Sequence, residues 1–298
     1  MNDRAPDAPA RIGALPIWRG PVEIEPLKGG LSNESYTVTG GDGKFVVRLG
    51  SDYPFHHVLR SRELMTARAA HAAGFAPEVV HAEPGLMVSR FIDGETYGEA
   101  EVRENLEAIA RLVRDFHMTM ARHVSGAGFI FWVFHVIRDY GRTLLAGNSR
   151  FTDRVDFYLD LAGKLEAVQA PLPVIFGHHD LLPANFIHDG ERLWLIDFEY
   201  AGFGTAMFDL AGIASNAGFG AAEAERLLET YFGAAPSPGI RRSHAAMQCA
   251  SLLREAMWSM VSEIHLDAPG VDYEAYTAEN LDRLSASLDS YQTRYGKV

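Results

Sequence analysis

Residues 173–203, PVIFGHHDLLPANFIHDGERLWLIDFEYAGF, constrain the fold more strongly than any other stretch of the chain. Residues 174–176 form a short apolar run with strand character. Residues 186–187 and 193–196 are two further apolar runs, and the turn cluster His188-Asp189-Gly190 lies between them, which is typical of a β-hairpin. The sequence therefore predicts a strand, a loop and a hairpin in succession.

Three polar residues accompany this framework. Asp180 and Asn185 lie five residues apart on the loop, and Asp197 follows the second hairpin strand. Phosphoryl transfer needs such groups, because one carboxylate accepts the proton of an attacking hydroxyl while an amide oxygen and a second carboxylate hold magnesium. Either aspartate alone would more simply cap a turn. The three together favour a metal–phosphate site.

The spacing matches a known pattern. In protein kinases the aspartate of H-R-D is followed five positions later by asparagine, and then by Asp-Phe-Gly. The counterparts here are His178-x-Asp180, Asn185 and Asp197-Phe198-Glu199. The chain resembles the kinase-like phosphotransferases of small molecules, the aminoglycoside phosphotransferase and choline/ethanolamine kinase group. HHDLLPANFI followed by LIDFEYAGF is most similar to the choline/ethanolamine kinase branch.

The resemblance implies an α+β fold of the protein-kinase type, in which a small lobe with a five-stranded antiparallel sheet precedes a larger, mainly helical lobe. We expect a loose leader at residues 1–20, a nucleotide-binding lobe at 21–93 and a catalytic and substrate lobe at 94–298. Apolar runs and turns predict strands at residues 22–27, 34–39, 44–49, 78–81 and 86–90. A helix is predicted over residues 57–73, and helical patterns dominate from residue 99 onward.

The first predicted hairpin carries Gly29, Gly30, Ser32 and Asn33. Glycines let backbone N–H groups approach phosphate without a Cβ in the way. The plain alternative is a turn with no other purpose. The resemblance implies that this loop covers the nucleotide.

Further nucleotide contacts are implied by position. Arg48 stands where kinases carry the lysine of the third strand, and Glu63 stands where a helix glutamate would pair with it. A solvent-facing arginine and an ordinary helix-surface pair are the alternatives. At the hinge, residues 91–94, adenine would bond to the backbone of Arg90 and Ile92.

Aromatic faces with a nearby carboxylate suit the ammonium group of an amino alcohol. The resemblance to choline kinases carries over at Tyr200, Trp258 and Tyr273, although each could equally be core. For Tyr276 we prefer core packing.

The chain also departs from the choline kinase pattern. Glu255 stands where a second aromatic is usual, and Asn216 stands where an acid is usual. We hypothesise that Glu255 supplies the missing negative charge. These departures leave ethanolamine or another amino alcohol open beside choline.

Three other polar residues, Asp209, His117 and His178, are assigned roles from their positions. Asp209 resembles the buried aspartate that holds the catalytic-loop backbone in this family, so we expect a structural role. We expect His117 to pack or cap, and we group His178 with the catalytic residues.

Composition excludes some classes of function. A net charge of −12 argues against nucleic acid as a partner. The single cysteine, Cys249, excludes an internal disulfide, suits a reducing cytoplasm and is expected in the core. The most apolar window, residues 126–137, is too short to span a membrane, and the N-terminus does not read as a signal peptide.

These observations predict a cytoplasmic kinase that uses ATP and Mg²⁺ to phosphorylate the hydroxyl of an amino alcohol, with choline or ethanolamine favoured. Asp180 would be the base, and Asn185 and Asp197 would hold magnesium. An aminoglycoside, thiamine, homoserine or a sugar are alternative acceptors, and a non-catalytic ATP-binding module is an alternative of another class. A homodimer is left open.

Overall fold

The computed structural model describes residues 8–27, 34–266 and 271–298. The small lobe contains an antiparallel sheet whose strands lie in the order β1-β2-β3-β5-β4. The strands are β1 (Glu23–Leu27), β2 (Glu34–Gly40), β3 (Gly43–Leu49), β4 (Val79–Glu83) and β5 (Leu86–Arg90). The five-stranded antiparallel sheet is therefore confirmed. The predicted phosphate loop, Gly29, Gly30, Ser32 and Asn33, lies outside the described residues.

The small lobe has its own hydrophobic core, because alternate residues of its strands point to one face. Phe45 and Val47 of β3 are buried on that face. A short helix, α1 (Ala8–Gly13), covers it with Ile12, and Leu15 follows into the same core. The expectation of a loose leader is therefore wrong from residue 8 onward.

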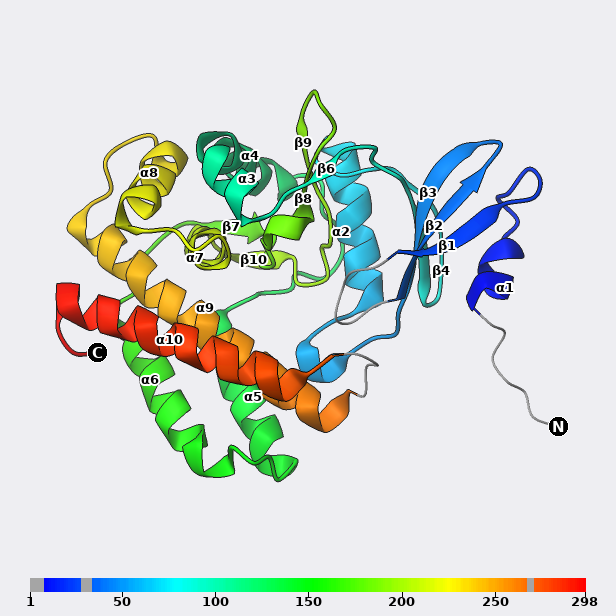
Figure 1. Cartoon of the computed structure of the whole chain (residues 1–298). Helices are drawn as coiled ribbons and strands as arrows, with labels where there is room; N and C mark the ends of the chain where they lie inside the picture. The colour runs from blue at the N-terminus through cyan, green and yellow to red at the C-terminus, as the bar shows by residue number, and fades with distance from the viewer. Residues whose placement is uncertain (1–7, 28–33, 267–270) are drawn as a thin grey trace.

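Helix α2 (Arg60–Ala72) stands between the sheet and the helical body (Figure 1). It begins later than predicted because a tight loop containing η1 (Pro54–His56) precedes it, closed by bridge pairing of Tyr53 with Val58. Ala67 and Ala70 of α2 pack into the core of the large lobe. The helix therefore joins the two lobes.

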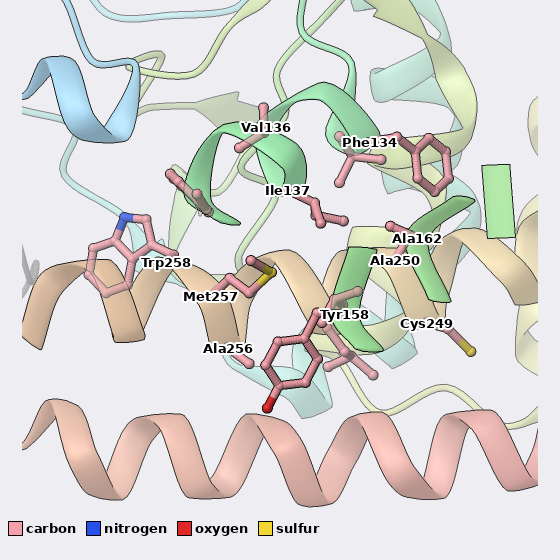
Figure 2. Close-up of a cluster of buried hydrophobic side chains, with 14 of the residues drawn as sticks. Phe134, Val136, Ile137, Tyr158, Ala162, Cys249, Ala250, Ala256, Met257 and Trp258 are labelled. Atoms are coloured by element: carbon pink, nitrogen blue, oxygen red, sulfur yellow. The ribbon is translucent and has the colours of Figure 1, made fainter. Parts of the chain in front are cut away.

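The large lobe is built mainly of helices: α3 (Glu99–Glu104), α4 (Leu106–Met120), α5 (Val133–Ala146), η2 (Thr152–Arg154), α6 (Val155–Ala167), α7 (Ala206–Asn216), α8 (Ala221–Phe232), α9 (Pro238–His265) and α10 (Tyr273–Tyr295). Helix α9 contacts α5, α6, α7 and α10. Figure 2 shows it between α5 and α10, with Trp258 near one end of the buried cluster and Cys249 near the other. Cys249 is a core residue, as predicted.

Two small sheets frame the stretch that the sequence singled out. β7 (Val174–Gly177) pairs antiparallel with β10 (Gly202–Thr205). After a loop and η3 (Pro183–Asn185), β8 (Phe186–His188) pairs with β9 (Leu193–Leu195), which confirms the hairpin. The edge of β8 also pairs with β6 (Glu95–Thr96), which directly follows the connection between the lobes. That connection is thereby tied to the hairpin.

The connection between the lobes passes close to this hairpin. A Cβ on Gly94 would lie 2.5 Å from the carbonyl oxygen of His188, so a side chain there would force the two segments apart. The exact domain boundary after residue 93 stays a prediction. Among the described residues, no helix is both long and apolar enough to cross a bilayer.

Candidate active site

Asp209 of α7 fixes the loop that carries the candidate base. Its Oδ2 accepts a hydrogen bond from the backbone N–H of His178 at 2.8 Å, and its Oδ1 accepts one from His179 at 2.7 Å. The carboxylate is 1 % exposed. These contacts let the loop hold His179 at a positive φ of 63°, which a residue other than glycine seldom adopts. The predicted structural part of Asp209 is confirmed.

A buried hydrogen-bond chain supports Asp209 in turn. His117 of α4 contacts the Asp209 carboxylate through Nε2 at 2.7 Å and the Tyr231 hydroxyl through Nδ1 at 2.8 Å. Burial alone would raise the pKa of Asp209, but the hydrogen bond from His117 and the neighbouring histidines bring it below its usual value. Helices α4, α7 and α8 therefore meet at the base of the loop.

His178 connects the loop to the hairpin. Its ring is fully buried, and Nε2 lies 2.9 Å from the carbonyl oxygen of Ile196, directly before Asp197. Burial lowers its pKa, so the ring stays neutral. His178 was predicted among the catalytic residues, but its place in the core gives it a positioning part instead.

Asp180, Asn185 and Asp197 are brought together by this framework. The side-chain amide of Asn185 donates to the backbone oxygen of Asp180 at 2.7 Å, which leaves its own oxygen available as a ligand. Burial, and then the negative charge of Asp197, raise the pKa of Asp180 well above its usual value. Asp197 has a positive φ of 66°. Such backbone strain is concentrated at functional sites.

This donor set fits magnesium. Mg²⁺ prefers oxygen ligands and is usually held by one or two carboxylates, with substrate phosphates and waters completing the octahedron. Asp197 and the amide oxygen of Asn185 supply such ligands, and a divalent cation would relieve the repulsion between Asp180 and Asp197. No group of three His, Cys, Asp or Glu side chains suited to a metal occurs among the described residues. Magnesium does not require such a group of three side chains, because phosphates and waters supply its remaining ligands.

Arg48 joins the small lobe to this group. Its Nη1 lies 2.5 Å from Glu63, so the predicted pairing of these two residues is confirmed. Its Nη2 lies 2.6 Å from Asp197. The Arg48 side chain is 16 % exposed, which excludes the alternative of a solvent-facing strand arginine.

The ion-pair network extends further than the sequence suggested. Arg60 contacts both Glu63 at 2.6 Å and Glu199 at 3.0 Å, and Arg62 donates to the backbone oxygen of Glu199 at 2.8 Å. The guanidinium of Arg62 also stacks on Phe129. The start of α2 is thus bound to the segment that follows Asp197. The only sign of this network in the sequence was Glu199, which stands where the Asp-Phe-Gly motif of protein kinases has glycine.

The hinge residues are only partly available to a nucleotide. The N–H of Arg90 already donates to Glu78, so only its carbonyl remains for an adenine amino group. The N–H of Ile92 has no acceptor among the described residues. The backbone N–H of Ile92 is therefore available to donate to an adenine nitrogen.

The candidate acceptor side gathers the predicted aromatics. The indole N–H of Trp258 donates to the hydroxyl of Tyr200 at 3.0 Å, and the ring of Trp258 lies 6.1 Å from that of Tyr273. His56 stacks on Trp258 as well, with 4.9 Å between the ring centroids. Tyr276 also belongs to this group, because its ring lies 6.2 Å from Trp258.

Glu255 lies in the same group but is already paired. One oxygen accepts from the hydroxyl of Tyr276 at 2.9 Å, and the other lies 2.8 Å from Nη1 of Arg254. Tyr276 therefore does more than fill the core. Arg254, which sequence reasoning missed, packs over the ring of Tyr200 at 4.5 Å. Asn216 contacts the loop instead of the aromatic group, since it donates to the carbonyl of Leu181, the residue after Asp180, at 3.4 Å.

An open hollow of about 560 Å³ adjoins the acceptor side through Tyr273. It is lined by Glu263, Leu266, Val271, Asp272, Tyr273 and Glu274. Three of these six residues are acidic, and one of them, Glu263, is already paired with Arg150. The hollow does not reach Asp180.

Known proteins resemble the chain over most of its length. Protein LicA of Haemophilus influenzae is 24 % identical over 265 residues, which cover 85 % of this chain and 76 % of that protein. A probable ethanolamine kinase of Arabidopsis thaliana is 26 % identical over 211 residues, covering 63 % and 54 %. A choline/ethanolamine kinase family protein of Mesorhizobium loti superposes with a TM-score of 0.76 at 28 % identity, covering 94 % and 93 %.

The family model described as the phosphotransferase enzyme family matches residues 23–245. That range includes the sheet, the loop with Asp180 and the hairpin with Asp197. The chain therefore belongs to the phosphotransferase enzyme family.

Proposed function

We propose that this protein transfers the γ-phosphoryl group of ATP to the hydroxyl of a small amino alcohol. The observation that carries the proposal is the meeting of Asp180, Asn185 and Asp197 at the mouth of one hairpin, with Arg48 of the other lobe on Asp197. Membership of a phosphotransferase family, and relatives named as choline and ethanolamine kinases, support it.

Each group has a defined task in this proposal. Asp180 orients the acceptor hydroxyl and takes its proton, and its proximity to Asp197 keeps it at the metal. Asn185 and Asp197 hold magnesium, which when bound neutralises phosphate oxygens. Arg48 keeps Asp197 in place and presents positive charge toward the phosphates. His178 and Asp209 keep the loop in register.

The acceptor is assigned from the aromatic group and its charge. The rings of Tyr273 and Tyr276 lie beside Trp258, and the hydroxyl of Tyr276 donates to the carboxylate of Glu255, an arrangement of aromatic faces and negative charge that suits an ammonium group. Choline and ethanolamine are the leading acceptors because relatives carry those names. A cytoplasmic location, where ATP and free thiols coexist, is part of the proposal.

The test is an acceptor panel with ATP and magnesium, read by ADP release. Choline, ethanolamine, other amino alcohols, an aminoglycoside, thiamine and a sugar are offered separately to the full chain. We expect an amino alcohol to give the highest kcat/KM. ADP release that no acceptor stimulates, with ATP bound, would instead support a non-catalytic nucleotide-binding module.

A further inference from the structure

Arg254 has an unused hydrogen-bonding edge in the interior of the acceptor side. Its side chain is buried, with the residue only 3 % exposed. Nη1 binds Glu255, and the guanidinium plane lies over Tyr200. The buried atoms Nε and Nη2 meet no acceptor in the part of the chain that the structure describes.

These two atoms form the side-on edge of a guanidinium, whose parallel N–H groups match the two oxygens of a carboxylate. The same edge is used elsewhere in this protein. Three other arginines each bind one carboxylate through Nε and Nη2, at distances of 2.5 to 3.1 Å. The pairs are Arg150 with Glu263, Arg226 with Glu107, and Arg241 with Glu225. Arg254 is more deeply buried than these three, so leaving its edge unmatched is more costly.

The position of the edge indicates what it binds. Arg254 is the positive charge that opposes the rise in the pKa of Asp180, so it lies near the candidate base. It is also the direct neighbour of Glu255. An acceptor whose hydroxyl faces Asp180 therefore brings its other groups within the range of both charges.

We propose that the free edge of Arg254 binds a carboxylate of the acceptor, so that this site takes a zwitterionic amino alcohol, a hydroxy amino acid in its simplest form. The inference rests on the proposed function and narrows it. The ammonium group would lie among Glu255 and the aromatics, and the carboxylate on Nε and Nη2 of Arg254.

The internal charges favour this class over a bare cation. Glu255 is already neutralised by Arg254, so a quaternary ammonium gains less from it. Two aromatic surfaces are also occupied from within, since Arg254 covers Tyr200 and His56 stacks on Trp258. A zwitterion places its ammonium group on Glu255 and its carboxylate on Arg254, so the net charge of the site does not change.

Another oxyanion, the γ-phosphate of the nucleotide, also matches the geometry of this edge. Arg254 lies on α9 beside the acceptor residues, whereas the described basic residue on the metal ligand is Arg48. The acceptor is therefore the favoured source. The experiment separates the two sources.

The experiment measures binding of matched alcohols to the full chain with magnesium and ADP present, by calorimetry. L-Serine is compared with ethanolamine, and L-homoserine with aminopropanol, because the members of each pair differ only by a carboxylate. In at least one pair we expect the carboxylated member to bind about a hundredfold more tightly or better. Arg254→Gln should abolish that difference, and Arg254→Lys should reduce it, because lysine keeps the charge but lacks the fork.

Arg242→Gln is the matched control on the same helix, since Arg242 donates to Tyr291 away from the site. It should leave the difference unchanged. If Arg254→Gln does not fold, the wild-type pairs and Arg254→Lys decide.

Equal affinities within both pairs, or binding of the carboxylate-free members alone, would overturn the inference. So would an Arg254→Gln variant that loses affinity for ATP and not for the acceptor. Turnover is assayed in parallel. If ethanolamine is phosphorylated as efficiently as serine, this inference is wrong and the proposed function still holds. If no alcohol is phosphorylated, the proposed function itself is contradicted.

Discussion

At the scale of single residues, the site contains groups whose burial opposes stability. Asp180 is a half-buried acid beside Asp197, and both its desolvation and the negative charge of Asp197 raise its pKa. A carboxyl group that costs free energy in the folded state is characteristic of functional sites rather than of structural ones. The sign is clear: a carboxyl whose pKa is raised on folding destabilises the fold above the pKa that it has when unfolded.

Asp180→Asn should therefore separate activity from stability. We expect kcat to fall by about a hundredfold to ten-thousandfold, because the base is lost. The melting temperature should rise, because a half-buried negative charge beside Asp197 is removed. Steady-state kinetics and thermal unfolding at neutral pH measure the two effects.

Asp160→Asn is the control, since Asp160 pairs with Lys164 on the exposed face of α6 and should alter neither quantity. An Asp180→Asn enzyme with unchanged kcat would show that this carboxylate is not the base.

The candidate residues were predictable where spacing along the chain defines the site. Asp180, Asn185 and Asp197 lie on one loop and one hairpin, so local sequence was sufficient to group them. Arg254 and Arg60 could not be found in this way, because their partners come from distant segments. Nothing in the local pattern of a helix distinguishes a buried arginine from a solvated one.

At the scale of elements, the loop with Asp180 is held by helices rather than by its own sequence. Asp209 of α7 accepts two backbone N–H groups from it, and His117 of α4 binds the same carboxylate. An amide in place of this carboxylate would offer one oxygen and one N–H₂ group. At least one buried donor would then face another donor.

Asp209→Asn should accordingly lower the free energy of unfolding by about 3 kcal/mol. It should also lower kcat, because the loop is no longer fixed, with a smaller effect on the KM for ATP. Denaturant unfolding and steady-state kinetics measure the two. Asp153→Asn, at an exposed position in η2, serves as the control. Full stability in Asp209→Asn would contradict the assigned anchoring role.

Element boundaries departed from prediction where tertiary pairing takes over from local pattern. Helical patterns were predicted to dominate from residue 99 onward, but residues 129–131 are not helical and α5 begins only at Val133, because Ile130 and Phe131 pair with Phe203 of β10. Helix α1 was missed because prolines surround it. Ile12, Leu15 and Trp18 were the apolar signal for it.

At the scale of the whole molecule, several histidines are buried in the neutral form. Burial lowers the pKa of His179 and of His244 to about 4. The unfolded chain binds protons at these positions below pH 6.5, whereas the folded chain does not until about pH 4. The stability that they contribute is therefore complete above pH 6.5 and is lost as the pH falls toward 4.

Between pH 6.5 and 4, each such histidine should add about 1.4 kcal/mol per pH unit to the slope with which the free energy of unfolding falls as the pH is lowered. His244→Leu removes one of them, so its slope should be shallower than that of the wild type. His123→Leu, at an exposed position, should leave the slope unchanged. Denaturant unfolding over this pH range gives the slopes. Parallel lines for wild type and His244→Leu would contradict the neutral, buried state of His244.

The general architecture was predictable because the catalytic stretch, the sheet and the helices each have a local pattern. The way the lobes join was not. It depends on α2, whose arginines reach Glu199 across the site, and on His56, which packs against Trp258. These contacts unite residues far apart in the chain.

The central claim is that the site around Asp180, Asn185 and Asp197 transfers a phosphoryl group from ATP to an alcohol. Phosphorus NMR of the full chain with ATP, magnesium and the best acceptor of the panel tests it most directly. The account predicts a phosphomonoester signal of the acceptor that grows in step with ADP, stops when magnesium is chelated and is absent with Asp197→Asn. ADP accompanied only by inorganic phosphate, or a phosphomonoester formed equally well by Asp197→Asn, would contradict it.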